Sequence, residues 1–205
     1  MTRFTANRVH FGQRPAEDVD DDGTGLPTPI RTKQLARRMA GIREAKAVLE
    51  HLPEPGESLH AIVTARMDQT DVINALLDNV GTCDRMAIAT LGYNAKNLRQ
   101  ILGWLDAGQV KSLTLLASRF FQSHNGAMWE QTLEDLRSRG QRAACCPSHA
   151  KVVAMEFADG RSFSIEGSAN LCGNGSGREQ FALFCDPELT RWHTTWITEL
   201  VAKHE

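Results

Sequence analysis

Two short groups of polar residues in the last third of the chain have side chains that could do chemistry together. The first reads His149-Ala150-Lys151 and the second reads Gly167-Ser168-Ala169-Asn170. An imidazole can act as a nucleophile or as a general acid and base. A lysine ammonium and an asparagine amide can donate hydrogen bonds to an oxygen on which negative charge develops. These residue types therefore suit a reaction that combines a nucleophile with stabilisation of an anion.

An Asp-Gly pair between the two groups predicts how they lie in space. Asp159-Gly160 separates two strand-like runs, and such a pair is a strong signal for a two-residue hairpin turn. This turn would place Lys151 opposite Ser168 and His149 opposite Asn170. Side chains alternate along a strand, so all four would project from one face. Because four polar groups would be wasted on a face meant for apolar packing, the pattern predicts a site.

The same residues resemble the signature of the phospholipase D superfamily. The likeness consists of His149-x-Lys151, the acid Glu156 seven residues after the histidine, and the downstream Gly-Ser-x-Asn. It extends over roughly residues 59–203, the length of one half of a two-motif member, and the motif occurs once. Glu156 stands where the family usually has Asp, and by strand parity it points away from His149, so we expect it to be structural.

The resemblance implies a metal-independent phosphodiesterase that needs no cofactor. His149 from each of two subunits would act as the nucleophile that forms a phosphohistidine and as the acid that protonates the leaving oxygen. Lys151 and Asn170 would donate to the nonbridging oxygens, with Ser168 as a further possible donor. Glu179 resembles the family's downstream glutamate, which fixes the tautomer of a catalytic histidine. Single-motif members, such as small bacterial endonucleases, complete the site as homodimers, so we expect a homodimer.

The elements that must position these residues follow from the hydrophobic pattern. Expected strands are 60–65, 86–91, 112–117, 142–146, 151–157, 161–167 and 180–185, and expected helices are 68–80, 95–107, 127–139 and 189–202. Alternating strands and helices favour parallel pairing, whereas the rapid succession of strands after Gly140 favours hairpins. We therefore predict an α/β fold with a mixed, largely parallel sheet flanked by helices and a β-hairpin that carries the motif.

The first 56 residues have a different character. Residues 1–30 combine an acidic cluster at 17–22 with several Gly and Pro, which predicts a disordered arm. Residues 31–56 hold apolar positions at helical spacing among basic ones and then a Pro-rich break, which predicts a basic amphipathic helix and a linker. A phosphate-binding or subunit-contacting helix remains an alternative to a solvated peripheral one. Residues 57–205 would then form the catalytic domain.

Composition excludes several classes of protein. The 205 residues carry a net charge of -2, with 41% hydrophobic and 23% charged residues, as expected for one globular domain. The apolar runs are far shorter than the roughly 20 residues that span a bilayer, and the N-terminus does not resemble a secretory signal. We expect a cytoplasmic protein without integral membrane association. Five cysteines are expected to be reduced, and strand neighbours Cys145 and Cys146 should face opposite ways, which disfavours a metal site with His149.

The substrate is less constrained than the chemistry. The sequence shows no evident lipid anchor and includes a predicted basic helix. We therefore favour a nuclease with a nucleic-acid substrate over a phospholipase or phosphatidyl transferase. A nucleic-acid-binding or assembly protein with little turnover is the alternative from another class. His51, His124 and His193 lack polar motif neighbours and are interpreted as ordinary histidines.

Overall fold

The computed structural model describes residues 43–63, 67–172 and 178–205. The chain divides into two units, Met1–Ile30 and Arg31–Glu205, and every described residue belongs to the second. The predicted acidic arm and most of the predicted basic helix therefore lie outside the described residues. The helix is seen over residues 43–48, and Ala45 and Leu49 are buried there.

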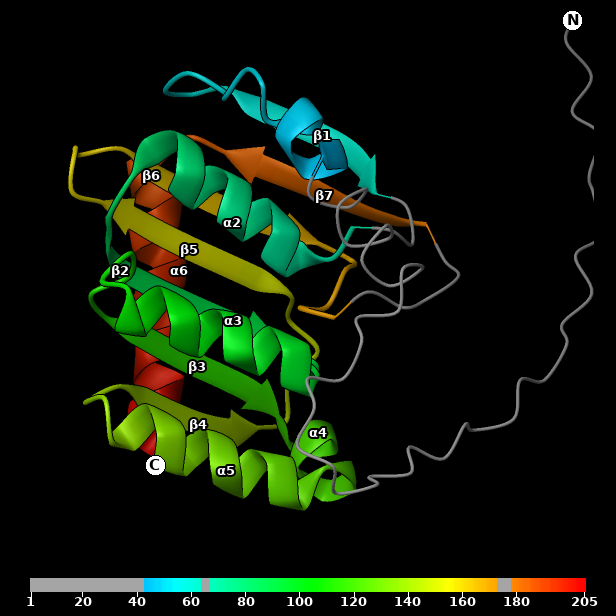
Figure 1. Ribbon diagram of the computed structural model, residues 1–205, viewed down its shortest axis with the longest axis vertical. Coiled ribbons are helices and arrows are strands. Elements are labelled where there is room, and N and C mark those ends of the chain that lie inside the picture. The colour runs from blue at the N-terminus through cyan, green and yellow to red at the C-terminus, as the bar shows by residue number, and fades with distance from the viewer. Residues whose placement is uncertain (1–42, 64–66, 173–177) are drawn as a thin grey trace, which may run out of the picture. The chain divides into compact units, whose positions relative to one another are not determined.

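Seven strands form one sheet in the order β1-β7-β6-β5-β2-β3-β4 (Figure 1). The strands are β1 (Ser58–Val63), β2 (Cys83–Thr90), β3 (Leu113–Ser118), β4 (Arg142–Cys146), β5 (Val152–Phe157), β6 (Ser162–Gly167) and β7 (Glu179–Phe184). Only the pairs β2–β3 and β3–β4 are parallel, and the other four neighbouring pairs are antiparallel. The mixed α/β fold is confirmed, but the prediction of a largely parallel sheet is wrong. β1 does not extend the parallel part, because it pairs antiparallel with β7.

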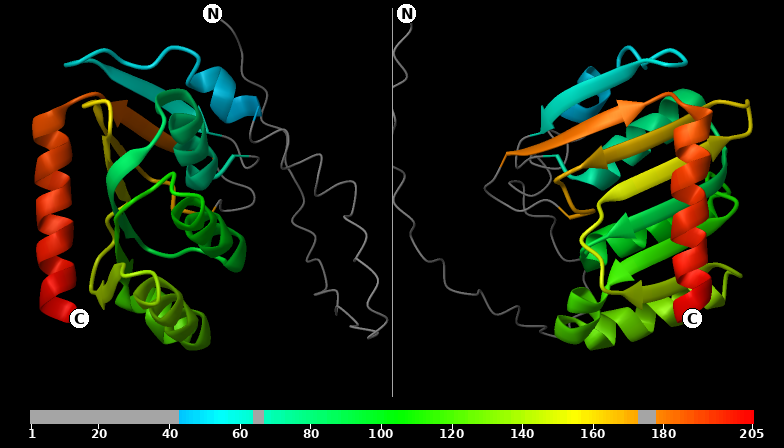
Figure 2. Two further views of the ribbon diagram at one scale, coloured as in Figure 1. Left: turned by 60° about the vertical axis from the view of Figure 1, so that its left-hand side comes forward. Right: turned by 180° about the vertical axis from the view of Figure 1, so that it is seen from behind.

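Helices cover both faces of this sheet (Figure 2). On one face lie α2 (Gln69–Val80), α3 (Ala95–Asp106) and α5 (Gly126–Arg137), and α6 (Pro187–His204) crosses the other. The short helix α4 (Arg119–His124), which the sequence pattern did not predict, follows β3 directly. The helices begin where capping residues predict, since Asp68 and Asn94 each form a capping box and Asp186 caps α6 before Pro187. Among the described residues, none of these helices has the length and apolar character to cross a bilayer.

The core consists of two apolar layers that the sheet separates. The larger layer packs under α2, α3 and α5, and the smaller one packs under α6. β4 contributes to both, because Cys145 belongs to the larger layer and Cys146 to the smaller one. The prediction that these two side chains face opposite ways is confirmed. Each cysteine of the chain is a free thiol.

The hairpin between β5 and β6 has a register that differs from the predicted one. The main-chain N–H of Gly160 donates to the carbonyl of Phe157, and Phe157 pairs with Arg161, so the loop holds three residues rather than two. Gly160 adopts φ +91°, which suits the left-handed position of a three-residue hairpin loop. The register therefore moves by one residue and places Lys151 against Gly167 instead of Ser168.

The motif residues lie at one edge of the sheet, which we call the motif edge. The parallel strands β2, β3 and β4 end there, and the antiparallel neighbour β5 begins there, with Ala89 paired to Val152. β6 ends at the same edge and β7 begins beside it. Segments far apart in the sequence thus meet at the motif edge.

Candidate functional site

His149 and Lys151 lie in the segment that leads into β5. The His149 side chain is exposed, and in the described part of the chain its ring has no hydrogen-bond partner. The Lys151 Nζ donates to the main-chain carbonyl of His149 at 2.9 Å and makes no ion pair with a described residue. Ala150 between them packs against the apolar layer under α6, and its N–H donates to the Ser148 Oγ at 3.1 Å. The segment is therefore fixed by its middle residue, with an imidazole and an ammonium group on the outside.

Ser168 connects β6 to the start of β7. Its hydroxyl donates to the Glu179 carboxylate and accepts from the Gln180 N–H at 3.1 Å. The Ser168 N–H donates in turn to the Gln180 carbonyl at 3.0 Å. The Ser168 proton is thus directed at Glu179, so the hydroxyl holds that carboxylate at the motif edge.

Gly167 allows the two groups of the motif to come together. Its N–H donates to the Lys151 carbonyl at 3.3 Å, which joins the segment before β5 to the end of β6. A Cβ atom at position 167 would lie 2.2 Å from the Gln180 carbonyl oxygen, so β7 approaches closely only because this residue has no side chain. The glycine in Gly-Ser-x-Asn is therefore a packing requirement.

Asn170 follows in a segment whose neighbours anchor it. Ala169 and Leu171 are buried, which leaves Asn170 and Ser168 between core residues. The Asn170 Oδ1 atom is itself buried and has no hydrogen-bond partner within the described structure. A buried carbonyl oxygen of this kind is costly unless a donor reaches it. The four motif residues thus share one edge, but the sheet register does not set them side by side as predicted.

A polar layer behind Asn170 was not anticipated from the sequence. The Asn97 side-chain amide donates to the Leu171 carbonyl at 3.2 Å and to the Thr70 hydroxyl at 3.1 Å. Asp68 accepts from the Lys96 ammonium at 2.9 Å within the same layer. Burial, followed by the nearby Asp68, raises the pKa of Asp71 to about 6. The capping boxes at the starts of α2 and α3 thus belong to a layer that supports the segment after Asn170.

Two further residues have clear partners away from the motif. Glu156 pairs with Arg85 across β2 and β5 at 2.8 Å, in agreement with the structural role expected for it. His193, interpreted as an ordinary histidine, is buried between polar partners on the α6 face. Its Nε2 lies 2.7 Å from Glu166 Oε1, and the Trp196 Nε1 donates to its Nδ1 at 3.0 Å. This contact fixes the tautomer, so Nε2 carries the proton and donates to Glu166.

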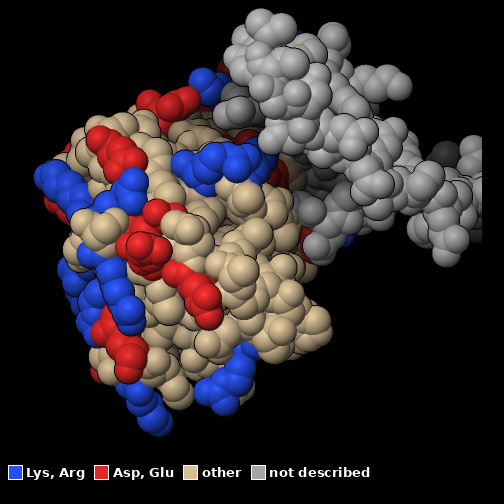
Figure 3. Space-filling model, turned by 60° about the horizontal axis from the view of Figure 1, so that its bottom comes forward, with Lys and Arg blue, Asp and Glu red and all other residues tan. Residues whose placement is uncertain are grey.

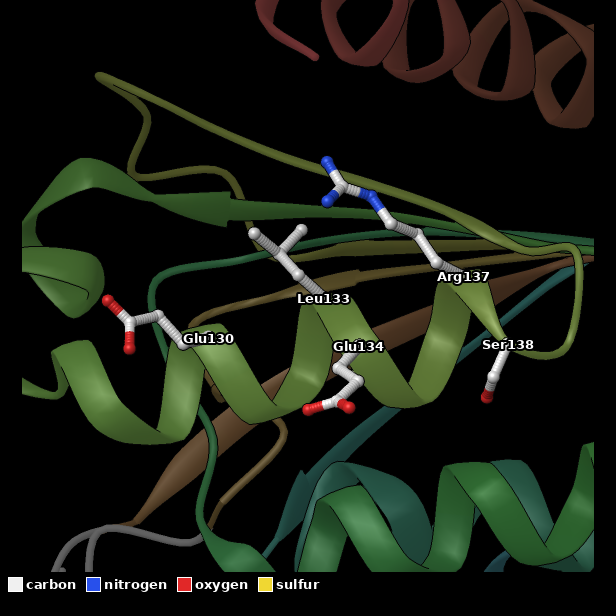
Figure 4. Close-up of a pocket in the computed structure, with 5 residues that line it drawn as sticks. All are labelled: Glu130, Leu133, Glu134, Arg137 and Ser138. Atoms are coloured by element: carbon white, nitrogen blue, oxygen red, sulfur yellow. The ribbon is translucent and has the colours of Figure 1, made fainter.

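Two grooves on the described surface lie away from the motif residues. One runs along α5 and is lined by Glu130, Leu133, Glu134, Arg137 and Ser138 (Figure 4). Another lies between α2 and α3 and includes Lys96, Arg99 and Gln109. Neither contains a motif residue. No group of three His, Cys, Asp or Glu side chains placed to hold a metal ion occurs within the described ranges.

Comparison with known proteins gives a likeness of fold. No family model matches the chain, and no curated protein matches its sequence. Among solved structures, the phospholipase D family member Nuc from Salmonella typhimurium matches with a TM-score of 0.50 and 8% identity, over 70% of this chain and 93% of that one. Phosphatidylserine synthase from Haemophilus influenzae matches with a TM-score of 0.50 and 14% identity, over 72% of this chain and 39% of that one. Polyphosphate kinase from Porphyromonas gingivalis matches with a TM-score of 0.51 and 13% identity, over 87% of this chain and 30% of that one. The chain therefore has a phospholipase D-like fold.

Proposed function

We propose that the protein is a phosphodiesterase that cleaves nucleic acid through His149. The observation that carries this proposal is that His149, an exposed imidazole without a hydrogen-bond partner among the described residues, shares a segment at the motif edge with Lys151, whose Nζ donates to the His149 main-chain carbonyl. A nucleophile beside a cation without an acidic partner suits attack on an anionic phosphodiester. The fold it shares with a phospholipase D family member supports this assignment.

The reaction would proceed in two displacements. A His149 ring nitrogen attacks phosphorus, the bond to the leaving oxygen breaks, and a second imidazole gives that oxygen its proton. Water then attacks the phosphohistidine, the phosphorus–nitrogen bond breaks, and the second imidazole takes the proton from water. Lys151 and the Asn170 amide stabilise the nonbridging oxygens, so charge neutralisation comes from side chains. Ser168 positions Glu179, which accepts a hydrogen bond from a catalytic imidazole.

The second imidazole would come from a second copy of the chain. One motif supplies one histidine, and the motif edge of the described residues holds no other histidine with comparable neighbours. In a twofold dimer, His149 of the partner subunit would take the acid role, and each residue of the motif would appear twice in the shared site. Light scattering at micromolar concentration should give the mass of a dimer, whereas a monomer that retains full activity would contradict the shared site.

Nucleic acid is the favoured substrate over lipid. The similar folds include both Nuc and a phosphatidylserine synthase, so the fold alone does not choose. The basic stretch at residues 31–46 favours a polyanion. A panel of single-stranded DNA, duplex DNA, RNA, bis(p-nitrophenyl) phosphate and phosphatidylcholine vesicles, all in EDTA, tests this. We expect cleavage of a nucleic acid and of the small diester, and no lipid turnover. Cleavage of the vesicles alone would replace the nuclease with a lipid enzyme, and no turnover of any substrate would overturn the proposal.

A further inference from the structure

The unpredicted helix α4 begins at the motif edge, the same edge of the sheet at which the segment that carries His149 lies. It begins directly after Ser118, the last residue of β3, whose register partner is Cys146 at the end of β4. His149 follows Cys146 by three residues. β3 is also two strands from β5, which corresponds to about 10 Å at the usual strand spacing. The start of α4 and the segment that carries the proposed nucleophile therefore lie at the same edge of the sheet.

The helix is held rigidly by one of its two aromatic residues. Phe121 is buried and stacks on Tyr93 with ring centroids 4.3 Å apart. The Tyr93 hydroxyl donates to the Thr132 hydroxyl at 2.8 Å, and the Ser118 Oγ caps the helix by accepting from the Phe121 N–H at 3.1 Å. These contacts leave α4 little freedom to turn.

The other aromatic residue faces solvent. Phe120 is 59% exposed, although large apolar side chains are usually buried. Its ring lies 4.1 Å from the His124 ring at an interplanar angle of 33°. The His124 Nδ1 is 2.8 Å from the Phe120 carbonyl oxygen, which keeps the imidazole against one side of the phenyl ring. Phe120 and His124 thus form a preorganised aromatic platform.

A cation completes this surface. Arg119 is exposed and makes no ion pair with any described residue. Burial raises the pKa of the Cys146 thiol, and the charge of Arg119 acts in the opposite direction, which is consistent with a guanidinium close to the end of β4. Elsewhere on the surface, Lys and Arg side chains lie interspersed with Asp and Glu, as the face in Figure 3 shows. Recognition of a polyanion therefore depends on local groups such as this one.

We propose that Arg119, Phe120 and His124, which we call the α4 platform, bind an unpaired nucleotide that flanks the scissile phosphodiester. The base stacks on Phe120, and the phosphate of the same or the next nucleotide contacts Arg119. An aromatic face next to a cation is the combination that binds single-stranded nucleic acid. The exposed neighbours Gln122, Ser123 and Asn125 are polar, so the platform offers one ring of apolar surface and not the wide patch that an acyl chain or a stable protein interface needs.

The proposal rests on the proposed function and makes it more specific. A base in a duplex is covered by its neighbours on both faces, so Phe120 can stack only on an unpaired base. The platform would therefore favour single-stranded over double-stranded substrate, a choice that the motif residues alone do not make.

Binding of a labelled single-stranded oligonucleotide in EDTA, in a His149→Ala background that prevents cleavage, tests the platform. We expect Phe120→Ala and Arg119→Ala each to weaken binding about tenfold, and Arg119→Ala to lower the salt dependence by about one counterion. Phe120→Leu, which keeps an apolar side chain without an aromatic ring, should weaken binding similarly. The matched controls are Trp192→Ala, a 61% exposed aromatic residue on α6, and Arg137→Ala, an exposed arginine on α5. Both should bind as the parent does.

A fluorescent base reports the contact itself. A 2-aminopurine in the oligonucleotide should be quenched by the parent protein and less so by Phe120→Ala or Phe120→Leu. Unchanged binding by Phe120→Ala, an equal loss for duplex DNA, or a changed oligomeric mass would overturn the platform. If the wild type cleaves no nucleic acid but binding still depends on Phe120, the proposed function fails and the platform stands. If cleavage occurs and is indifferent to Phe120 and Arg119, only the platform fails.

Discussion

The hydroxyl of Ser168, the residue after β6, donates a hydrogen bond to the carboxylate of Glu179, the first residue of the neighbouring strand β7. The same oxygen accepts the Gln180 N–H, so one side chain fixes both the strand and the carboxylate. Because Glu179 is the proposed partner of a catalytic imidazole, the orientation of that imidazole would depend on a residue that does not touch the substrate.

Replacement of Ser168 by Ala should therefore reduce kcat more than it changes KM. The change leaves Glu179 without the hydroxyl proton, and loss of a hydrogen bond to a charged group corresponds to roughly tenfold in rate. Ser168→Thr, which keeps the hydroxyl, should recover most of kcat, and Ser138→Ala at the exposed end of α5 should have no effect. Steady-state kinetics on bis(p-nitrophenyl) phosphate measures this. An effect on KM alone would assign Ser168 to substrate binding instead.

Gly167→Ala should destabilise the fold. The new methyl group would meet the Gln180 carbonyl oxygen at 2.2 Å and force β6 and β7 apart, at a cost of roughly 1–3 kcal/mol. Gly103→Ala is the matched control, because this position lies inside α3 with nothing within 4 Å of the added Cβ. There, alanine should stabilise the protein by about 0.5–1 kcal/mol. Urea unfolding of both variants provides the comparison, and equal stabilities would show that β7 does not pack on Gly167.

Asp71 should lower the stability of the protein as the pH rises from about 4 to about 6, opposite in sign to Asp106 and Asp159, whose pKa values are lowered by hydrogen bonds from Arg139 and Arg161. Burial, followed by Asp68, raises the pKa of Asp71 to about 6 from its usual 3.8, so the folded state retains a proton that the unfolded state has already lost. The loss amounts to at most about 3 kcal/mol and is complete above the folded-state pKa. Asp71→Asn removes this titration and should be the more stable protein at pH 7, since an amide oxygen can still accept the Asp68 N–H. The free energy of unfolding of wild type and Asp71→Asn, measured as a function of pH, tests this prediction. Asp78→Asn, on the exposed side of the same helix, is the control. Parallel curves for Asp71→Asn and wild type would contradict the assignment.

Trp196→Phe should cost about 1–3 kcal/mol, because it removes the donor to the Nδ1 of His193 and leaves a buried acceptor unpaired. Trp192→Phe removes an indole from the exposed side of the same helix and should change stability by less than about 0.5 kcal/mol. Thermal unfolding of the two variants compares them directly. Equal melting temperatures would mean that the His193 hydrogen bonds contribute nothing to the fold.

Local sequence signals predicted most of the elements and failed where pairing is long-range. The hydrophobic pattern placed α2, α3 and α6 to within a few residues, because this signal acts within one or two turns. The partner of β1 is β7, more than a hundred residues later, and no local pattern encodes that pairing or its antiparallel direction. α4 escaped prediction because six residues with one buried aromatic give no readable helical period.

The candidate site was predicted in composition but not in geometry. Asp159-Gly160 signals a tight hairpin, yet it fits a two-residue and a three-residue loop alike, and only the packing of β5 and β6 selects the second. The one-residue difference removed the predicted pairing of Lys151 with Ser168 and revealed the packing role of Gly167. The polar layer around Asn97 depends on its contact with Leu171, and the place of α4 at the same edge as the motif depends on the pairing of β3 with β4. Both involve segments that are distant in the sequence, so a sequence motif could not indicate them.

The rate of phosphodiester cleavage by His149→Ala, relative to wild type, tests the central claim most directly. With bis(p-nitrophenyl) phosphate and single-stranded DNA in EDTA, loss of the nucleophile should reduce kcat by at least about a thousandfold, while His204→Ala, at the exposed end of α6, should leave cleavage of both substrates unchanged. Circular dichroism and light scattering should show the same fold and oligomeric mass for all three proteins. A His149→Ala protein that cleaves both substrates at the wild-type rate would contradict the account.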